Sequence, residues 1–143
     1  MASVRVLIVD DQVPFRRAAQ AVVESTDEFI VVGAVETAEQ CLAEVDSLNP
    51  DLILMDVNLP GIDGVEASRR LRISHPAMVV ILLSSYDQAE FADLTQDCGA
   101  AAYLPKSMFG PDRLEETWSA ITSSRSGSGT SGISAVTTRP APN

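Results

Sequence analysis

Positive charge is scarce in this chain of 143 residues. Lysine and arginine together number 10 against 20 aspartates and glutamates, which gives a formal net charge of −10 at pH 7. The basic residues are almost all arginine, and the only lysine is Lys106. Such an acidic protein repels the phosphate backbone of DNA and RNA, so we expect no direct nucleic-acid binding.

Long apolar runs and cysteine pairs are also missing. The longest apolar runs span six or seven residues, whereas a membrane-spanning helix needs roughly 20. No basic segment leads into a longer apolar stretch, as a secretory signal would require, so we expect a soluble, cytoplasmic protein without membrane contact. The two cysteines, Cys41 and Cys98, lie far apart in the sequence. This spacing favours buried, reduced thiols over a zinc site.

Acidic residues are absent from the last part of the chain, residues 123–143. This segment consists mainly of Ser, Gly, Thr and Pro, and its only sizeable apolar side chains are Ile133 and Val136. A segment with so little to bury cannot offset the entropy cost of folding. We therefore predict one folded domain over residues 1–122, followed by a disordered tail or linker over residues 123–143.

The rest of the chain alternates apolar runs with helical patterns. The runs predicted as strands are the apolar part of Ser3–Gln12, which stops at Asp10 and Asp11, and then Phe29–Val35, Asp51–Val57, Met78–Ser85 and Ala101–Leu104. Helical spacing of apolar residues is seen between them, at Phe15, Ala18, Ala19, Val22 and Val23, and later at Phe91, Leu94, Thr95 and Cys98. Strands that are apolar throughout are typical of a parallel sheet covered on both faces. The fold class predicted is therefore α/β, a three-layer sandwich.

Helix boundaries are marked by local signals. Thr37 followed three positions later by Gln40 predicts a capping box, and Asp63 has a glutamate at the same offset. Asn49 before a proline predicts a helix end. Gly110 before a proline predicts the start of the last helix.

Polar residues follow the apolar runs directly. They are Asp10, Asp11, Asp56, Ser84, Ser85 and Lys106. In open parallel sheets the functional crevice lies outside the carboxyl ends of the strands, where these residues would meet. Converging carboxylates raise one another's pKa unless a cation offsets their repulsion. Carboxylate oxygens with room for water suit Mg²⁺, and a carboxylate beside such a cation can act as the nucleophile in phosphoryl transfer.

This set of residues in this order, with "LMDVNLPGIDG" around Asp56 as its most specific part, resembles the receiver domain of bacterial two-component response regulators. The resemblance covers about residues 3–122. It implies a flavodoxin-like sheet of strand order 2-1-3-4-5. It also implies a phosphorylation-dependent signalling switch, which is not an enzyme beyond slow self-dephosphorylation. The subfamily that it looks most like usually carries a C-terminal LuxR-type helix-turn-helix for transcription regulation, which this sequence does not include.

The resemblance also implies a metal site and a phosphoacceptor. By resemblance, Asp56 would accept a phosphoryl group from a sensor histidine kinase. Asp11 and Asp56 would hold Mg²⁺ together with the backbone carbonyl of Asn58, and Asp10 would act through a coordinated water.

The same resemblance implies a switch. Lys106 and Ser84 would bind the phosphoryl oxygens, and Tyr103 would be the aromatic residue that turns inward as the hydroxyl moves. The switch would change partner binding or dimerisation, so a homodimer is an additional partner to consider. Phe91 is an interface candidate on the face that docks partners in the family.

Two other functions remain open from the sequence. One is a Mg²⁺-dependent phosphohydrolase with an aspartate nucleophile, although such enzymes normally use an Asp-x-Asp pattern and this chain has two adjacent acids. The other is an interaction module that keeps the fold but works without phosphorylation. A dinucleotide-binding role is excluded because no Gly-x-Gly-x-x-Gly follows the first strand.

Overall fold

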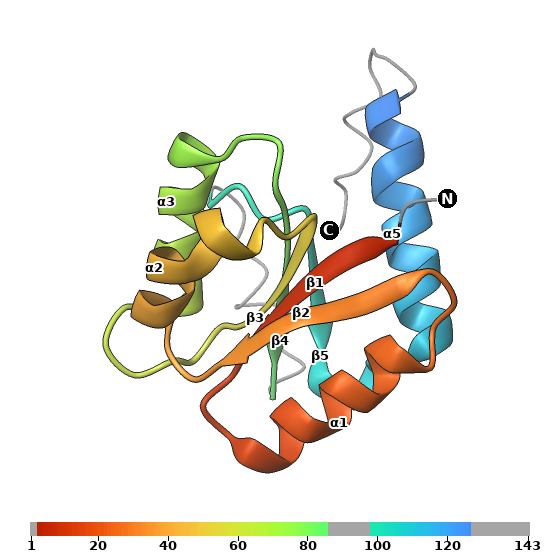
Figure 1. Cartoon of the computed structure of the whole chain (residues 1–143), viewed down its shortest axis with the longest axis horizontal. Helices are drawn as coiled ribbons and strands as arrows, with labels where there is room; N and C mark the ends of the chain where they lie inside the picture. The colour runs from red at the N-terminus through yellow and green to blue at the C-terminus, as the bar shows by residue number, and fades with distance from the viewer. Residues whose placement is uncertain (1–2, 86–97, 127–143) are drawn as a thin grey trace.

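A single five-stranded parallel sheet forms the centre of the protein (Figure 1). The computed structural model describes residues 3–85 and 98–126. The strands are β1 (Val4–Val9), β2 (Phe29–Val35), β3 (Leu52–Asp56), β4 (Val79–Ser84) and β5 (Ala102–Pro105). They are hydrogen-bonded in the order β2-β1-β3-β4-β5, and each pairing is parallel. The flavodoxin-like order implied by the sequence resemblance is confirmed.

Helices cover both faces of this sheet. Helices α1 (Val13–Glu24) and α5 (Pro111–Ser126) lie on one face, and α2 (Ala38–Leu48) and α3 (Gly64–Ser74) lie on the other. A short 3-10 helix, η1 (Lys106–Met108), follows β5 directly. The three-layer sandwich is therefore confirmed. The helix predicted around Phe91, Leu94 and Thr95 falls outside the described residues.

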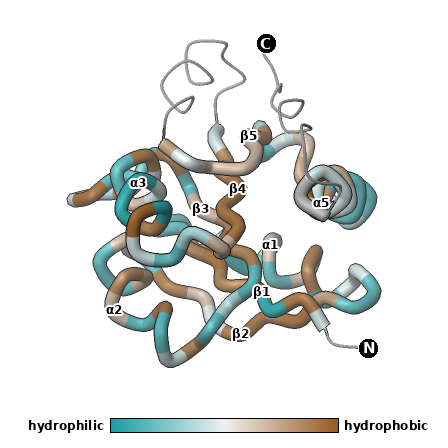
Figure 2. The backbone as a smooth tube through the Cα atoms, turned by 90° about the horizontal axis from the view of Figure 1, so that it is seen from above, coloured by the Kyte–Doolittle hydropathy of each residue, from teal (hydrophilic) through white to brown (hydrophobic). Residues whose placement is uncertain are grey.

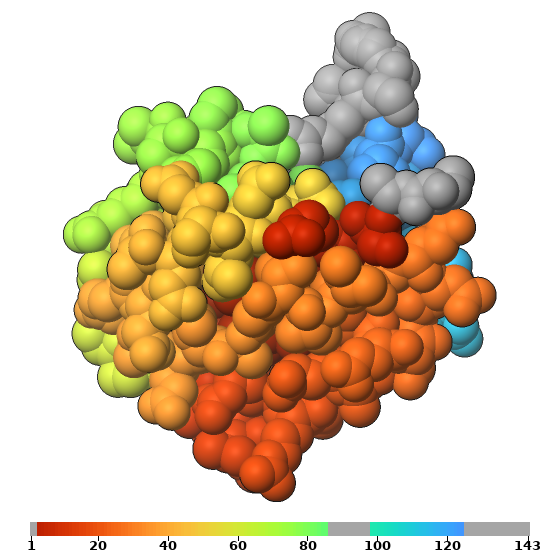
Figure 3. Space-filling view, in the orientation of Figure 1, coloured from red at the N-terminus to blue at the C-terminus, as the bar shows by residue number. Residues whose placement is uncertain are grey.

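Two apolar cores lie on the two faces of the sheet. Leu7 and Val9 of β1 pack in the core beneath α2 and α3, whereas Val6 and Ile8 pack in the core beneath α1 and α5. Every residue of β3 and β4 is buried, and the hydrophobic colour in Figure 2 follows β4 at the centre. In the space-filling view of Figure 3, β2 and α2 cover most of β1. Burial on both faces explains why these strands are apolar throughout rather than alternating.

The predicted helix signals are mostly observed. The capping box is present, with the Thr37 hydroxyl accepting from the Gln40 N–H and the Gln40 side chain accepting from the Thr37 N–H. The Asp63 carboxylate caps α3. Asn49 ends α2 in the left-handed conformation, with φ of 49°. In α1, however, Ala18 is exposed and does not belong to the buried face.

Several further predictions concern the thiols and the C-terminus. Cys41 and Cys98 are buried and form no disulfide, as expected, and burial raises the pKa of the Cys41 thiol to about 12. Helix α5 continues to Ser126, into the segment predicted as a tail, and residues 127–143 lie outside the described residues. None of the described helices combines the length and apolar character that crossing a membrane would need.

Candidate functional site

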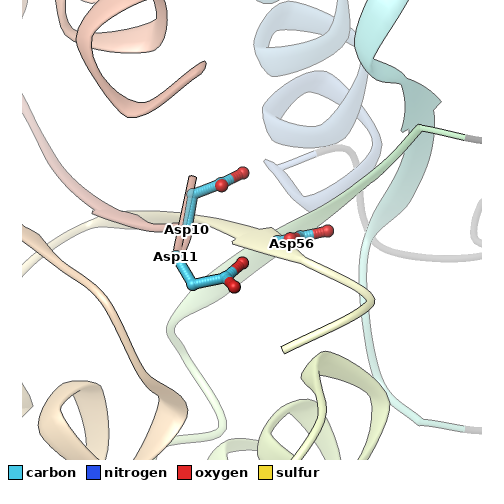
Figure 4. A group of neighbouring side chains, drawn as sticks. All are labelled: Asp10, Asp11 and Asp56. Carbon is cyan, nitrogen blue, oxygen red and sulfur yellow. The ribbon is translucent and has the colours of Figure 1, made fainter. Parts of the chain in front are cut away.

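Three carboxylates meet at one end of the sheet. Asp10 and Asp11 follow β1, and Asp56 is the last residue of β3. The two strands are adjacent, with Val9 opposite Met55, so their carboxyl ends lie side by side. One carboxylate oxygen from each of the three acids lies within 4.8 Å of the others, and Figure 4 shows all three side chains extending beyond the strand ends. The sequence prediction that these acids converge is therefore matched by the geometry.

The single lysine of the chain reaches this cluster from the first residue of η1, directly after β5. Lys106 Nζ lies 2.7 Å from Asp10 Oδ2 and 3.5 Å from Asp56 Oδ2. Both carboxylates are buried, and 9% of the Lys106 side chain is exposed. A buried carboxylate is costly without a partner. The ammonium therefore compensates part of the charge, and it is closer to Asp10 than to Asp56.

Backbone groups hold the other carboxylate oxygens. The Gln12 N–H donates to Asp10 Oδ1 at 2.8 Å, and the Asn58 N–H donates to Asp56 Oδ1 at 3.2 Å. Asp10 Oδ2 is buried and, within the described part of the chain, receives no hydrogen bond of good geometry. Its short contact with the Lys106 ammonium is an ion pair only. This oxygen therefore retains lone pairs that a cation could use.

The electrostatics of the cluster leave negative charge uncompensated. The pKa of Asp56 is raised to about 6, first by burial and then by the charge of Asp10, although Lys106 and the Asn58 N–H lower it. Three acids face one ammonium, so a divalent cation would relieve the remaining repulsion. Carboxylate oxygens grouped at this distance, one of them on the exposed Asp11, fit a Mg²⁺ ion that keeps several waters.

The remaining predicted site residues lie close to this end of the sheet or on β5. Ser84 is the buried last residue of β4, one position beyond the residue that pairs with Asp56. Asn58 is exposed and lies two positions after Asp56. Tyr103 lies opposite Leu82 in the middle of β5 and packs against the core beneath α2 and α3. Phe91 falls outside the described residues.

A family model agrees with this arrangement. The model for the response regulator receiver domain matches residues 6–118. The chain belongs to this family. The part that matches includes all the acids of the cluster together with Ser84, Tyr103 and Lys106.

Individual relatives support the assignment of this receiver domain. It is 36% identical over 105 residues to the transcriptional regulatory protein DegU of Brevibacillus brevis, covering 73% of this chain and 44% of that protein. It is 37% identical over 103 residues to the response regulator GacA of Pseudomonas viridiflava, covering 72% and 48%. The receiver domain therefore spans about half the length of these relatives. A LuxR-family response regulator from Aurantimonas sp. SI85-9A1 superposes with a TM-score of 0.78 at 27% identity, covering 87% of this chain and 88% of that one.

Three residues around the site of the receiver domain were not predicted from the sequence. The face of the Phe15 ring lies against the Lys106 ammonium, at 4.5 Å from the ring centroid. Arg16 Nη1 donates to the Asp10 carbonyl at 2.8 Å. A Cβ on Gly64 would lie 2.2 Å from the Asp56 carbonyl oxygen, so only glycine allows α3 to begin this close to β3. The helical spacing of α1 predicted Phe15 as a core residue. The only sequence signal for a place near the site was its position one helical turn after Asp11.

Proposed function

We propose that this receiver domain accepts a phosphoryl group from a sensor histidine kinase onto Asp56, with Mg²⁺ as its cofactor. The observation that carries the proposal is the cluster of three carboxylates within 4.8 Å, with one buried ammonium in contact with two of them. The new charge on Asp56 would change partner binding or drive formation of a homodimer. We expect the phosphoryl transfer to take place in the cytoplasm.

Asp10, Asp11 and Asp56 would hold the metal ion. The Asn58 backbone carbonyl would be a further ligand, and Asp10 would act through a water. When bound, Mg²⁺ would neutralise negative charge on the transferring phosphoryl group. The fit is supported by the donor set, which consists of carboxylate oxygens, and by the grouping of one oxygen from each acid within 4.8 Å.

Asp56 is suited to act as the nucleophile. A carboxylate oxygen would attack the phosphorus atom, the P–N bond to the kinase imidazole would break, and its electron pair would leave on the imidazole nitrogen. Attack requires the ionised carboxylate, and because the pKa of Asp56 is about 6, most of the protein carries it at pH 7 or above. Oδ1 is held by the Asn58 N–H, while Oδ2 lies 3.5 Å from Lys106 Nζ. The ammonium is thus beside the place where the phosphoryl charge would arrive.

The phosphoryl group would then favour one of two arrangements of the loops around Asp56. Lys106 and the Ser84 hydroxyl would form charge-assisted bonds to its oxygens, and Tyr103 would pass the change towards the partner-binding face. Moving a two-state equilibrium from 1:99 to 99:1 takes about 5.5 kcal/mol of differential binding. Two such charge-assisted bonds, at about 1.5–3 kcal/mol each, can supply most of that free energy.

The test is phosphorylation by a small-molecule phosphodonor with Mg²⁺, followed by intact mass measurement. Wild type should gain one phosphoryl group, and Asp56→Asn should gain none. Asp51→Asn is the matched control, because it removes an exposed carboxylate just before the other end of β3, where the side chain accepts from the Arg5 N–H. A phosphoryl group on Asp56→Asn would refute the assignment. Rapid turnover of a phosphate ester by wild type would instead favour a phosphohydrolase, and unchanged partner affinity of Asp56→Asn would favour a phosphorylation-independent module.

A further inference from the structure

The Lys106 ammonium contacts an aromatic ring as well as two carboxylates. Besides Asp10 and Asp56, the ammonium contacts the face of Phe15, with Nζ at 4.5 Å from the ring centroid. A cation over a ring face within about 6 Å is attracted by the negative face of the ring, and the attraction strengthens when water is excluded. The Lys106 side chain is 9% exposed, so water is largely excluded here.

We propose that Phe15 is a positioning residue for phosphoryl transfer, whose ring face holds the Lys106 ammonium over Asp56. The proposal rests on the proposed function, since it assigns Phe15 a part in the same reaction. It acts through Lys106 and needs no contact between Phe15 and the phosphoryl group.

An aromatic face has a specific advantage in this position. The lysine side chain is long and flexible, so an unrestrained ammonium would spend much of its time away from the site. A carboxylate in place of the ring would hold the ammonium too, but it would add negative charge and compete with the phosphoryl group. The ring attracts the cation without a directional acceptor. Lys106 can therefore turn from Asp10 towards Asp56 while it keeps its contact with Phe15.

One contact holds the ring, and another holds the helix that carries it. Phe15 and Phe109 have their ring centroids 6.2 Å apart and their planes inclined at 50°. Phe109 closes the turn that begins at Lys106, because its N–H donates to the Lys106 carbonyl at 3.2 Å. Arg16, the residue after Phe15, donates to the Asp10 carbonyl and ties the first turn of α1 to the acids. The segment that supplies two carboxylates thus also supplies the surface against which the lysine rests.

Lysine labelled with ¹³C at Cε gives a direct measurement of the contact. Since Lys106 is the only lysine, one Cε resonance is expected from the whole chain. Protons above a ring face are shifted upfield, so the Hε signals of wild type should lie upfield of their free-lysine position. The shift should persist in Phe15→Tyr and disappear in Phe15→Leu. An Hε position in wild type equal to that in Phe15→Leu would overturn the proposal.

The functional measurement is the rate of phosphorylation by the small-molecule phosphodonor with Mg²⁺. Loss of a partly desolvated cation–π contact should slow Phe15→Leu about 5- to 30-fold, whereas Phe15→Tyr should remain within about 2-fold of wild type. Phe29→Leu is the matched control. It removes a ring that contacts Trp118 in the core beneath α1 and α5 and should leave the rate unchanged.

The outcomes separate this proposal from the proposed function. A wild type that never gains a phosphoryl group refutes the proposed function. A wild type that is phosphorylated, with Phe15→Leu at the same rate, refutes the positioning role alone. Equal slowing in Phe15→Leu and Phe29→Leu would also refute it, because a general loss of stability would then be the cause. If Phe15→Leu does not fold, Phe15→Met takes its place with the same expectation, since methionine adapts to irregular space.

Discussion

Replacing Asp56 by asparagine should stabilise the metal-free domain at neutral pH. Asp56 is 4% exposed, and burial together with Asp10 raises its pKa from 3.8 to about 6. A raised carboxyl pKa means that the ionised form is disfavoured in the folded state. The folded protein therefore binds this proton more tightly than the unfolded chain, and the free energy of unfolding falls as pH rises through the interval from about 4 to 6.

The size of the effect follows from the same pKa. A shift of roughly two pKa units, at 1.36 kcal/mol per unit, corresponds to about 3 kcal/mol lost once Asp56 is fully ionised. Asparagine carries no charge and can still accept the Asn58 N–H through its Oδ1. We therefore expect Asp56→Asn to gain about 1–3 kcal/mol at pH 7.5 and to lose this advantage near pH 4.

Urea unfolding in the presence of a chelator measures the difference. Wild type and Asp56→Asn are compared at pH 7.5, 6 and 4.5. Because both proteins are measured at each pH, the titration of the other groups cancels in the difference between them. The control Asp51→Asn should show no gain, because that carboxylate is exposed. The electrostatic reasoning would be refuted if Asp56→Asn were no more stable than wild type at pH 7.5. It would also be refuted if the stability difference between the two proteins did not change with pH. Added Mg²⁺ should stabilise wild type by about 1.4 kcal/mol at ten times its Kd and should stabilise the variant less.

Three further predictions concern residues around the site and the sheet. Lys106→Met leaves the buried Asp10 carboxylate without its cation, so the thermal midpoint should fall, and Mg²⁺ should raise that midpoint by more than it does in wild type; an equal Mg²⁺ response would contradict this. Gly64→Ala places a Cβ 2.2 Å from the main-chain oxygen at the end of β3 and should cost about 1–3 kcal/mol in urea unfolding, whereas Gly110→Ala, with nothing within 4 Å of its Cβ, should cost less. Arg5→Met removes two donors to carbonyl oxygens at the end of α2, at 2.7 and 3.1 Å, and should lower the free energy of unfolding by about 1–2 kcal/mol in the same assay. A decrease below a few tenths of a kcal/mol would contradict a stabilising role for these bonds.

The fold was predictable because each strand carries its own signal. The run from Phe29 to Val35 matches β2 at both ends, and the remaining strands differ from their predicted bounds by a few residues at most. Parallel strands buried on both faces have to be apolar throughout, so their boundaries appear in the sequence as changes in hydropathy. The capping box at Thr37 was equally readable, because its hydrogen bonds join residues only three positions apart.

Contacts between distant segments were not predictable in the same way. Lys106 was expected to meet Asp10 and Asp56, because all three follow parallel strands. Its contact with the Phe15 ring depends on how α1 packs beside the site, and no local pattern encodes it. The need for Gly64 arises from the distance between α3 and the last carbonyl of β3. The end of α5 at Ser126 was missed for another reason, since the change to a Ser-rich composition at residue 123 does not mark where the last helical turn stops.

The same uncompensated negative charge that destabilises the metal-free acid cluster also favours the binding of a cation there. Ionised Asp56 costs the metal-free fold about 3 kcal/mol, first through burial and then through repulsion by Asp10. A cation that offsets the charge recovers part of this free energy, and full recovery would correspond to roughly a 100-fold increase in affinity for that cation. A proton recovers it as well, so protons and Mg²⁺ should compete below about pH 6. The apparent Mg²⁺ affinity of wild type should therefore fall as pH drops through 6, while in Asp56→Asn it should change little over the same interval.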